Sequence, residues 1–106
     1  MAQEIVVLIT ASSEDEAAKI GGALVEEHLA ACVNIIPGVR SFFFWDGAAK
    51  NEKETLCLCK SRQPLLDALI RRVKALHSYT VPEIIALPVV GGAQDYLDWL
   101  AEATKR

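Results

Sequence analysis

Apolar residues along this chain of 106 residues fall into short continuous runs and longer stretches with helical spacing. The first run, residues 5–9, is unbroken and predicts a central strand. Ser13 and Glu16 follow with the spacing of a capping box, and apolar residues then recur every three or four positions, which predicts a helix over residues 13–28. The pair Gly21-Gly22 weakens this helix, and small residues there would let it lie close to a sheet.

A long hairpin is predicted after the first helix. Residues 32–36 have the composition of a strand, Pro37-Gly38 interrupts it, and residues 39–45 continue in an extended conformation. Asp46-Gly47 is a turn sequence, and residues 53–60 form the returning strand.

The second half of the chain repeats the order of helix and strand. Pro64 precedes residues 66–76, whose apolar positions have helical spacing. Residues 84–90 form a final apolar strand in which Pro88 should lie near the end or on an edge, because proline donates no hydrogen bond. A closing helix follows two glycines and contains Tyr96, Leu97, Trp99 and Leu100.

The predicted order is therefore strand, helix, strand, strand, helix, strand and a last helix. This order is typical of an α+β protein with a ferredoxin-like βαββαβ sandwich, here extended by a C-terminal helix. The first two helices then cover one face of an antiparallel sheet and leave the other face open. The length of the chain and the absence of a linker-like segment predict a single domain over residues 1–106.

Residues 42–45, Phe-Phe-Phe-Trp, place large rings on both faces of the predicted hairpin, because successive side chains of a strand point to opposite sides. The helices can cover one set of rings, and another copy of the chain is the simplest cover for the other set. Hydrophobic residues make up 52% of the chain, more than one small core needs, which also indicates a subunit interface.

The net charge and the N-terminal sequence argue against several classes of function. The net charge of −3 argues against nucleic-acid binding, which usually needs a basic surface. No apolar run reaches membrane-spanning length, and the N-terminus has no basic region before an apolar stretch, so we expect neither a membrane partner nor a signal peptide. Three cysteines without a secretion signal favour reduced thiols in a cytoplasmic protein.

The cysteines also allow a thiolate-site hypothesis. Cys57 and Cys59 lie two positions apart on a predicted strand and point to the same face, roughly 6.5–7 Å apart, which is a poor spacing for a disulfide. Core packing is the simpler interpretation, because free cysteine is often buried. The same interpretation holds for Cys32, and zinc-finger spacing is absent from the sequence.

A polar segment lies between the second helix and the final strand. Pro82 holds the residue before it in an extended conformation, and rigid flanking elements keep side chains of such a segment in place. His77, Tyr79 and Glu83 are therefore candidates for the rim of a binding site. The alternative is an ordinary helix exit with surface groups, where a histidine suits the C-terminal end of the helix.

The hairpin supplies further candidates. Lys60 and Arg40 are the cations expected near strand ends at a subunit junction, where they would attract an anion, form a salt bridge or remain solvated. The tip at Trp45 is placed to reach another copy of the chain, although ordinary burial explains a tryptophan equally well.

Four blocks of the sequence resemble the CutA divalent-cation-tolerance family. They are Leu-Ala-Ala-Cys-Val-Asn-Ile-Ile-Pro-Gly-Val from residue 29, Phe-Trp-Asp-Gly from residue 44, His-Ser-Tyr-Thr-Val-Pro-Glu-Ile from residue 77 and Asp-Tyr-Leu-Asp-Trp-Leu from residue 95. The blocks occur in the family's order and cover nearly the whole chain. The resemblance implies a ferredoxin-like subunit in a tight homotrimer, similar in plan to the PII signal proteins, and an association with copper and other divalent metals.

The family's proposed copper ligands carry over only in part. They are a cysteine near the end of the first strand, where this chain has Ile9, and histidines beside a His-Pro-Tyr-type motif. Leu76 precedes the motif here, and Ser78 stands where the family often has proline. Only His77 matches, and one imidazole needs further ligands from carboxylates, thiolates or other subunits. We therefore expect weak binding of Cu²⁺ or another divalent cation at His77, and no organic cofactor.

The resemblance also implies a cleft between subunits, which we expect Tyr79, Glu83, Lys60 and Trp45 to line. The predicted function is that of a homotrimer in divalent-cation tolerance that binds metal or a small ligand in these clefts. A structural trimeric scaffold or a PII-like signalling protein without a metal role is the alternative.

We expect no enzyme. The stretch Thr-Ala-Ser-Ser from residue 10 lacks the arginine of the phosphate-holding loop in acylphosphatases, which share the subunit fold. A cysteine nucleophile would need a base, and no histidine lies beside a cysteine in the sequence.

Overall fold

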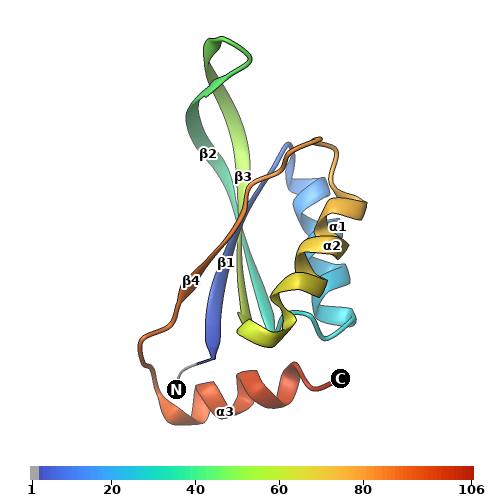
Figure 1. The fold of residues 1–106 in the computed structure, drawn as a ribbon, viewed down its shortest axis with the longest axis vertical. Helices are drawn as coiled ribbons and strands as arrows, with labels where there is room; N and C mark the ends of the chain where they lie inside the picture. Colours follow the sequence, from blue (N-terminus) through green and yellow to red (C-terminus); the bar gives the residue numbers. More distant parts are fainter. Residues whose placement is uncertain (1–2) are drawn as a thin grey trace.

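The computed structural model describes residues 3–106, in which strands and helices follow the predicted order (Figure 1). The elements are β1 (Glu4–Ala11), α1 (Glu14–Glu26), β2 (Cys32–Trp45), β3 (Ala48–Arg62), the short 3₁₀ turn η1 (Gln63–Leu65), α2 (Leu66–Leu76), β4 (Ile84–Pro88) and α3 (Gln94–Ala103).

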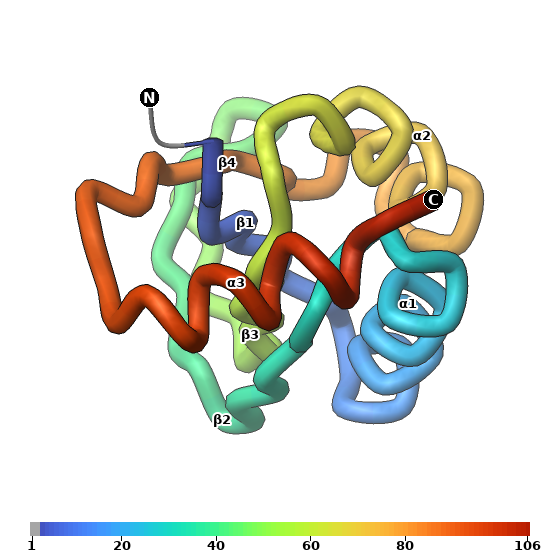
Figure 2. Tube along the Cα trace, turned by 90° about the horizontal axis from the view of Figure 1, so that it is seen from below, coloured from blue at the N-terminus to red at the C-terminus, as the bar shows by residue number. Residues whose placement is uncertain are grey.

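The strands form one antiparallel sheet in the order β2-β3-β1-β4. Helices α1 and α2 lie side by side on one face of this sheet, and α3 runs across its lower end (Figures 1 and 2). The α+β class, the antiparallel sheet and the additional C-terminal helix are therefore as predicted, and the strand order is that of a ferredoxin-like sandwich.

The core lies between the sheet and the two inner helices. Alternate residues of β1, from Ile5 to Ala11, point toward the helices and are buried, whereas Val6 and Leu8 on the opposite face are half-buried. Leu24 of α1 and Val73 of α2 pack into the same cluster. This alternation is the pattern of a sheet that is covered on one side.

The two central cysteines belong to this core. Cys57 and Cys59 have no exposed surface, and burial raises the pKa of their thiols to about 11 and about 12, respectively. The thiols are therefore protonated at neutral pH, which confirms packing rather than a thiolate site. Cys32 is half-buried and is also free.

Helix α1 begins as predicted and ends earlier. The Ser13 hydroxyl accepts a hydrogen bond from the Glu16 amide at 3.1 Å, which confirms the N-cap. The helix ends at Glu26 rather than at residue 28, because His28 adopts a left-handed conformation with φ 61°. The amide of Leu29 then bonds the carbonyl of Leu24 at 2.8 Å, which closes the helix in a Schellman motif.

The two glycines of α1 have different surroundings. A Cβ at Gly21 would lie 3.0 Å from Val33 Cγ1 on β2, whereas a Cβ at Gly22 would meet nothing within 4 Å. The close approach of helix and sheet that the glycine pair predicted is therefore confirmed for Gly21.

The hairpin of β2 and β3 extends beyond the rest of the sheet as an arm (Figure 1). Pro37 and Gly38 form a bulge, where the register shifts between Ile36 and Val39. Asp46 and Gly47 both have positive φ, 52° and 78°, which is the geometry of a tight hairpin turn.

The limits of two strands differ from the prediction. β3 begins at Ala48 and ends at Arg62, beyond the predicted residues 53–60, because its polar first part pairs with the aromatic part of β2 as far as Trp45 opposite Ala48. β4 ends at Pro88 rather than at residue 90. Its edge position leaves one side of the strand unpaired, as a terminal proline requires.

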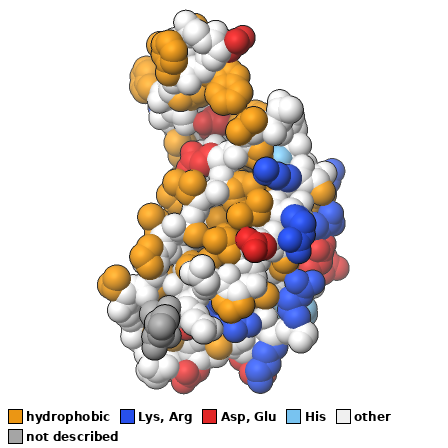
Figure 3. Space-filling view, in the orientation of Figure 1, with side chains coloured by type: hydrophobic (Ala, Val, Ile, Leu, Met, Phe, Trp, Pro, Cys, Tyr) orange, Lys and Arg blue, Asp and Glu red, His pale blue; other side chains and the backbone are white. Residues whose placement is uncertain are grey.

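The aromatic residues of the arm are exposed on both of its sides. Phe42 and Phe44 are 74% and 73% exposed, and Phe43 and Trp45, which point the other way, are 40% and 52% exposed. Hydrophobic side chains also gather over the open part of the sheet below the arm (Figure 3).

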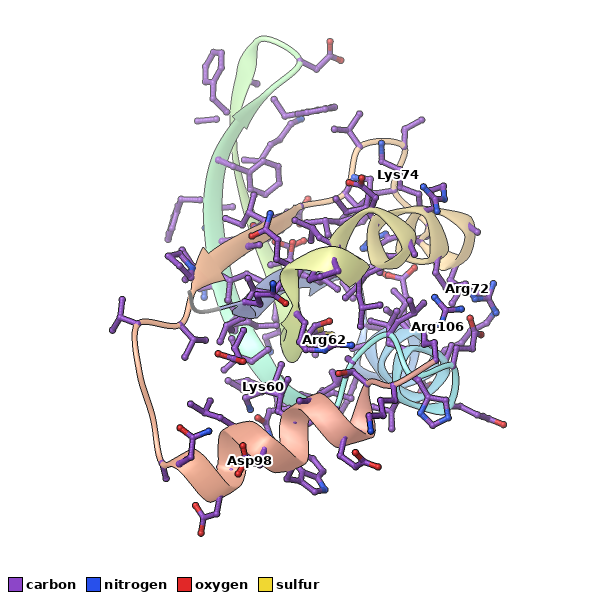
Figure 4. The ribbon with its side chains drawn as sticks, turned by 60° about the horizontal axis from the view of Figure 1, so that its bottom comes forward. Lys60, Arg62, Arg72, Lys74, Asp98 and Arg106 are labelled. Atoms are coloured by element: carbon purple, nitrogen blue, oxygen red, sulfur yellow. The ribbon has the colours of Figure 1, made fainter. Side chains whose placement is uncertain are left out.

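The C-terminal helix is fixed to the end of β3. The Arg62 guanidinium donates to the hydroxyl of Thr104 at 2.7 Å and to its carbonyl at 3.2 Å. Thr104 itself is fully buried, and so is nearly all of Leu100. Lys60 lies at the same lower end of the sheet (Figure 4).

The glycine pair gives a test of this packing. We expect Gly22→Ala to stabilise the fold by about 0.5–1 kcal/mol, because alanine favours a helix and the site has room. Gly21→Ala should stabilise the fold less than Gly22→Ala or destabilise it, since the added methyl group meets Val33. Chemical denaturation of both variants measures the difference, and equal gains would contradict the close approach.

Candidate functional site

An open groove of about 1020 Å³ lies between the arm and the segment that joins α2 to β4. Trp45 lines it from the arm, and Tyr79 and Glu83 line it from the connecting segment. The structure therefore brings together three of the four residues predicted for a cleft.

Lys60, the fourth residue, lies elsewhere in the chain. It is paired with Cys32 and Val6 near the lower end of the sheet, where its ammonium group donates to Asn34. A place for Lys60 in a cleft with Trp45 then depends on a neighbouring subunit and stays a prediction. Arg40, the other predicted cation, does line the groove and donates to the Asn51 side chain at 2.9 Å.

His77 anchors the connecting segment. Its side chain has no exposed surface, and Nε2 lies 2.7 Å from the carbonyl oxygen of Thr10 at the end of β1. The Tyr79 amide donates to Nδ1 at 3.0 Å. This pair of bonds requires the neutral tautomer with hydrogen on Nε2, because the Thr10 carbonyl is an acceptor and the amide is a donor.

The anchoring bonds bear on the metal prediction for His77. A metal ion binds the lone pair of an imidazole nitrogen, and Nδ1 already accepts the Tyr79 amide. Ligation would therefore displace this hydrogen bond and bring the ring out of its buried position. The role of His77 as a metal ligand stays a prediction.

The other family positions offer no further ligand. Ile9 is fully buried in the core, and Leu76 packs against this core cluster. Within residues 3–106, no group of three or more histidine, cysteine or acidic residues is arranged to hold a metal ion. The described side chains of one chain therefore do not form a complete transition-metal site.

Glu16 ties α1 to the same segment. One carboxylate oxygen accepts the amide and the hydroxyl of Ser12, both at 2.9 Å, and the other accepts the Ser78 amide at 2.7 Å. Burial alone would raise the pKa of Glu16, but these hydrogen bonds outweigh it and lower the pKa to about 2. The capping-box spacing was the sequence signal for Glu16, although its reach to Ser78 was not foreseen.

Tyr79 connects the segment to β3. Its hydroxyl donates to Glu54 Oε2 at 2.8 Å, and its ring packs on His77 with 4.6 Å between the ring centres. Burial and the bond to Glu54 raise the pKa of Tyr79, so the phenol stays protonated. Glu54 is only 7% exposed, and sequence reasoning missed it, because a lone glutamate at the start of a strand gives no signal of burial.

Glu83 lies beside this pair on the rim of the groove. Loss of hydration raises the pKa of its carboxyl, and the nearby Glu54 carboxylate raises it further. The groove therefore combines exposed aromatic rings with carboxylates that repel one another.

Comparison with known proteins connects this geometry to a family. Residues 5–103 match the family model described as CutA1 divalent ion tolerance protein. The chain belongs to this family.

The most similar relatives include the divalent-cation tolerance protein CutA of Thermus thermophilus, 54% identical over 101 residues, which are 95% of this chain and 98% of that protein. The solved Thermus thermophilus structure superposes with a TM-score of 0.94 over 96% of this chain and 99% of its own. A chloroplastic CutA 1 protein from rice is 46% identical, and the chain spans only 57% of its length. The Thermus thermophilus relative is named as a tolerance protein and the rice relative as a CutA protein, and neither name is that of an enzyme.

The location of the chain stays a prediction. The rice relative is described as chloroplastic, and a CutA structure from Archaeoglobus fulgidus, 40% identical with a TM-score of 0.93 over 96% of this chain and 99% of its own, is described as periplasmic. Among residues 3–106, each helix is too short or too polar to cross a membrane. These two descriptions name different compartments, so membership of the family does not fix the predicted cytoplasmic location.

The junction at Glu16 gives a second prediction. Since the folded-state pKa lies below the ordinary value of 4.5, the carboxylate stabilises the fold fully above pH 4.5, and the contribution disappears as the pH falls to about 2. We expect Glu16→Gln to lose up to ~3 kcal/mol of stability at neutral pH. The free energy of unfolding of this variant should also depend less on pH between about 2 and 4.5.

Denaturation at several pH values checks this expectation. Asp15→Asn is the matched control, because Asp15 is exposed in the same helical turn. Equal losses in both variants would show that the charge near the helix start matters and the contact with Ser78 does not.

Proposed function

We propose that the chain forms a homotrimer that acts in divalent-cation tolerance and binds a divalent cation or a small ligand in clefts between its subunits. The family to which the chain belongs supports the tolerance role. The assembly is supported by the single observation that the helices within residues 3–106 leave most of one face of the sheet bare.

The open face is apolar across the sheet. Leu8 on β1 lies opposite Leu58 on β3 and Ile85 on β4, so three large side chains form a row on that face. Ile85 is 52% exposed, and Ile36 extends the apolar surface on β2. Contiguous apolar surface of this kind is typical of a subunit interface rather than of a free-standing monomer.

A neighbouring copy on this face would also border the groove. The arm that carries Trp45 extends away from the body of its own chain, and the rings on its two sides need cover. A cleft completed by a second subunit gives these rings a partner and leaves Tyr79 and Glu83 facing the enclosed space.

Within this proposal, metal binding is weak. Cu²⁺ or another divalent cation would take His77 as one ligand, at the expense of the hydrogen bond from the Tyr79 amide. The remaining ligands would come from carboxylates or from a neighbouring subunit.

The second candidate is a trimeric scaffold or a PII-like signalling protein without a metal role. The burial of His77 favours it, because both ring nitrogens already have partners within the chain. The two candidates share the assembly and differ in what enters the cleft.

The assembly is tested by placing a charge on the open face. We expect Ile85→Lys to dissociate the trimer, because a lysine cannot be buried unpaired in an apolar interface. Val25→Lys is the matched control, since Val25 is similarly exposed, at 40%, on the helical side. Light scattering at micromolar concentration measures the mass, and a wild-type particle with the mass of one chain would refute the assembly.

Metal binding is tested by calorimetric titration of metal-free protein with Cu²⁺ and Zn²⁺. His77→Ala should reduce the heat of binding, because it removes the imidazole ligand. Tyr79→Phe is the control, as it keeps the His77 ring and the backbone hydrogen bond. Identical heats for wild type and His77→Ala would leave the scaffold or signalling candidate.

A further inference from the structure

Three carboxylates of the groove lack a cationic partner. Glu52, Glu54 and Glu83 all line the groove, and within residues 3–106 none of them forms an ion pair. Arg40 and Lys53 also line the groove. They form a cross-strand pair one position away from Glu52 and Glu54, so their side chains project from the opposite face of the arm.

Glu54 is the most constrained of these carboxylates. It is more than nine-tenths buried, with 7% of its surface exposed, and it lines the groove. Oε2 accepts the Tyr79 hydroxyl, whereas Oε1 has no donor among the described residues and keeps some surface, since none of their fully buried side-chain oxygens lacks a hydrogen-bond partner. This oxygen can therefore accept a hydrogen bond from a charged group that enters the groove. The groove thus has a place for a positively charged group beside Glu54.

Aromatic rings line the rest of this position beside Glu54. Phe43 and Trp45 lie two positions apart on one face of β2. Their cross-strand neighbours Lys50 and Ala48 share this face with Glu52 and Glu54, and of these four residues the two glutamates line the groove. Tyr79 brings a third ring from the connecting segment. Ring faces attract cations, and they do so most strongly for alkylammonium groups, which are less hydrated than metal ions.

The same groups suit other ligands poorly. An anion would meet three carboxylates, which outnumber the two cations, Arg40 and Lys53, among the residues that line the groove. A metal ion needs several ligands at fixed short distances, and the described residues contain no group of three that could hold one. An ammonium group needs only acceptors and ring faces, which the groove has.

We propose that this groove binds an organic ammonium ligand, with its charge between Glu54 and Glu83 and its hydrocarbon part against Phe43, Trp45 and Tyr79. The inference rests on the proposed function, in which the groove belongs to the ligand-binding cleft of the trimer. It assigns the small ligand of that cleft to the class of primary or substituted amines.

The test is a titration of the full-length protein with n-butylammonium chloride at constant ionic strength, followed by amide chemical shifts in the presence of EDTA. We expect saturable shifts of Tyr79, Glu83 and Phe43, with a dissociation constant on the order of millimolar. n-Butanol and butyrate have the same hydrocarbon chain without the positive charge and should cause no saturable shift there. Equal binding of all three probes would overturn the proposal.

A pair of variants tests the carboxylates. Glu83→Gln keeps the shape of an exposed side chain and should weaken n-butylammonium binding about tenfold or more. Glu26→Gln, which removes an exposed charge on α1 outside the groove, should leave it unchanged. Unchanged affinity in Glu83→Gln, or an equal loss in both variants, would refute the assignment.

Light scattering on the same samples separates this inference from the proposed function. A trimer that shows no saturable shift with n-butylammonium refutes the ammonium site and leaves the assembly intact. A particle with the mass of one chain refutes the trimer, and saturable shifts that Glu83→Gln weakens in that sample would still support the groove as an ammonium site.

Discussion

Both inner helices pack on one face of the four-stranded sheet, and in residues 3–106 α3 reaches only the lower end of the sheet, so the rest of the molecule depends on this asymmetry. The covered face holds the core from Ile5 to Val73, and the bare face carries a row of large aliphatic side chains from Leu58 to Ile85. The arm adds to this bare surface, because its rings project from both sides and two of them, Phe42 and Phe44, are 74% and 73% exposed. Apolar surface left bare in this way is the physical basis of the proposed assembly, independent of any family resemblance.

The position of the groove wall depends on two polar junctions. His77 bonds the end of β1 through Thr10, and Glu16 bonds the segment at Ser78 from the first turn of α1. Both side chains are largely buried, so their hydrogen bonds are shielded from water and hold the segment firmly. The wall that carries Tyr79 is thus fixed to the same elements that form the core. The histidine of the family motif first serves as an anchor, whatever else it binds.

Local sequence patterns predicted most helices and strands, but they could not predict contacts between residues far apart in the sequence. The Ser13 cap, the Gly21 contact and the edge position of Pro88 each follow from one residue and its neighbours. The early end of α1 at Glu26 was missed, since a left-handed histidine at position 28 in place of glycine gives a weak signal. The buried role of Glu54 depends on Tyr79, 25 positions away, and only the fold brings the two together.

The residues along one face of β3 show where packing surface gives way to binding surface. Leu58 and Leu56 continue the apolar row of the open face, and the next residue on that face is Glu54. A leucine there would extend the row without the cost of burying a charge. The sequence changes from leucine to glutamate at the position where the groove begins and where Tyr79 supplies a single neutral donor. A surface meant only to pack against another copy has no need of this carboxylate, whereas Glu54 fixes Tyr79 on the groove wall and lines the space that we propose for the ammonium ligand.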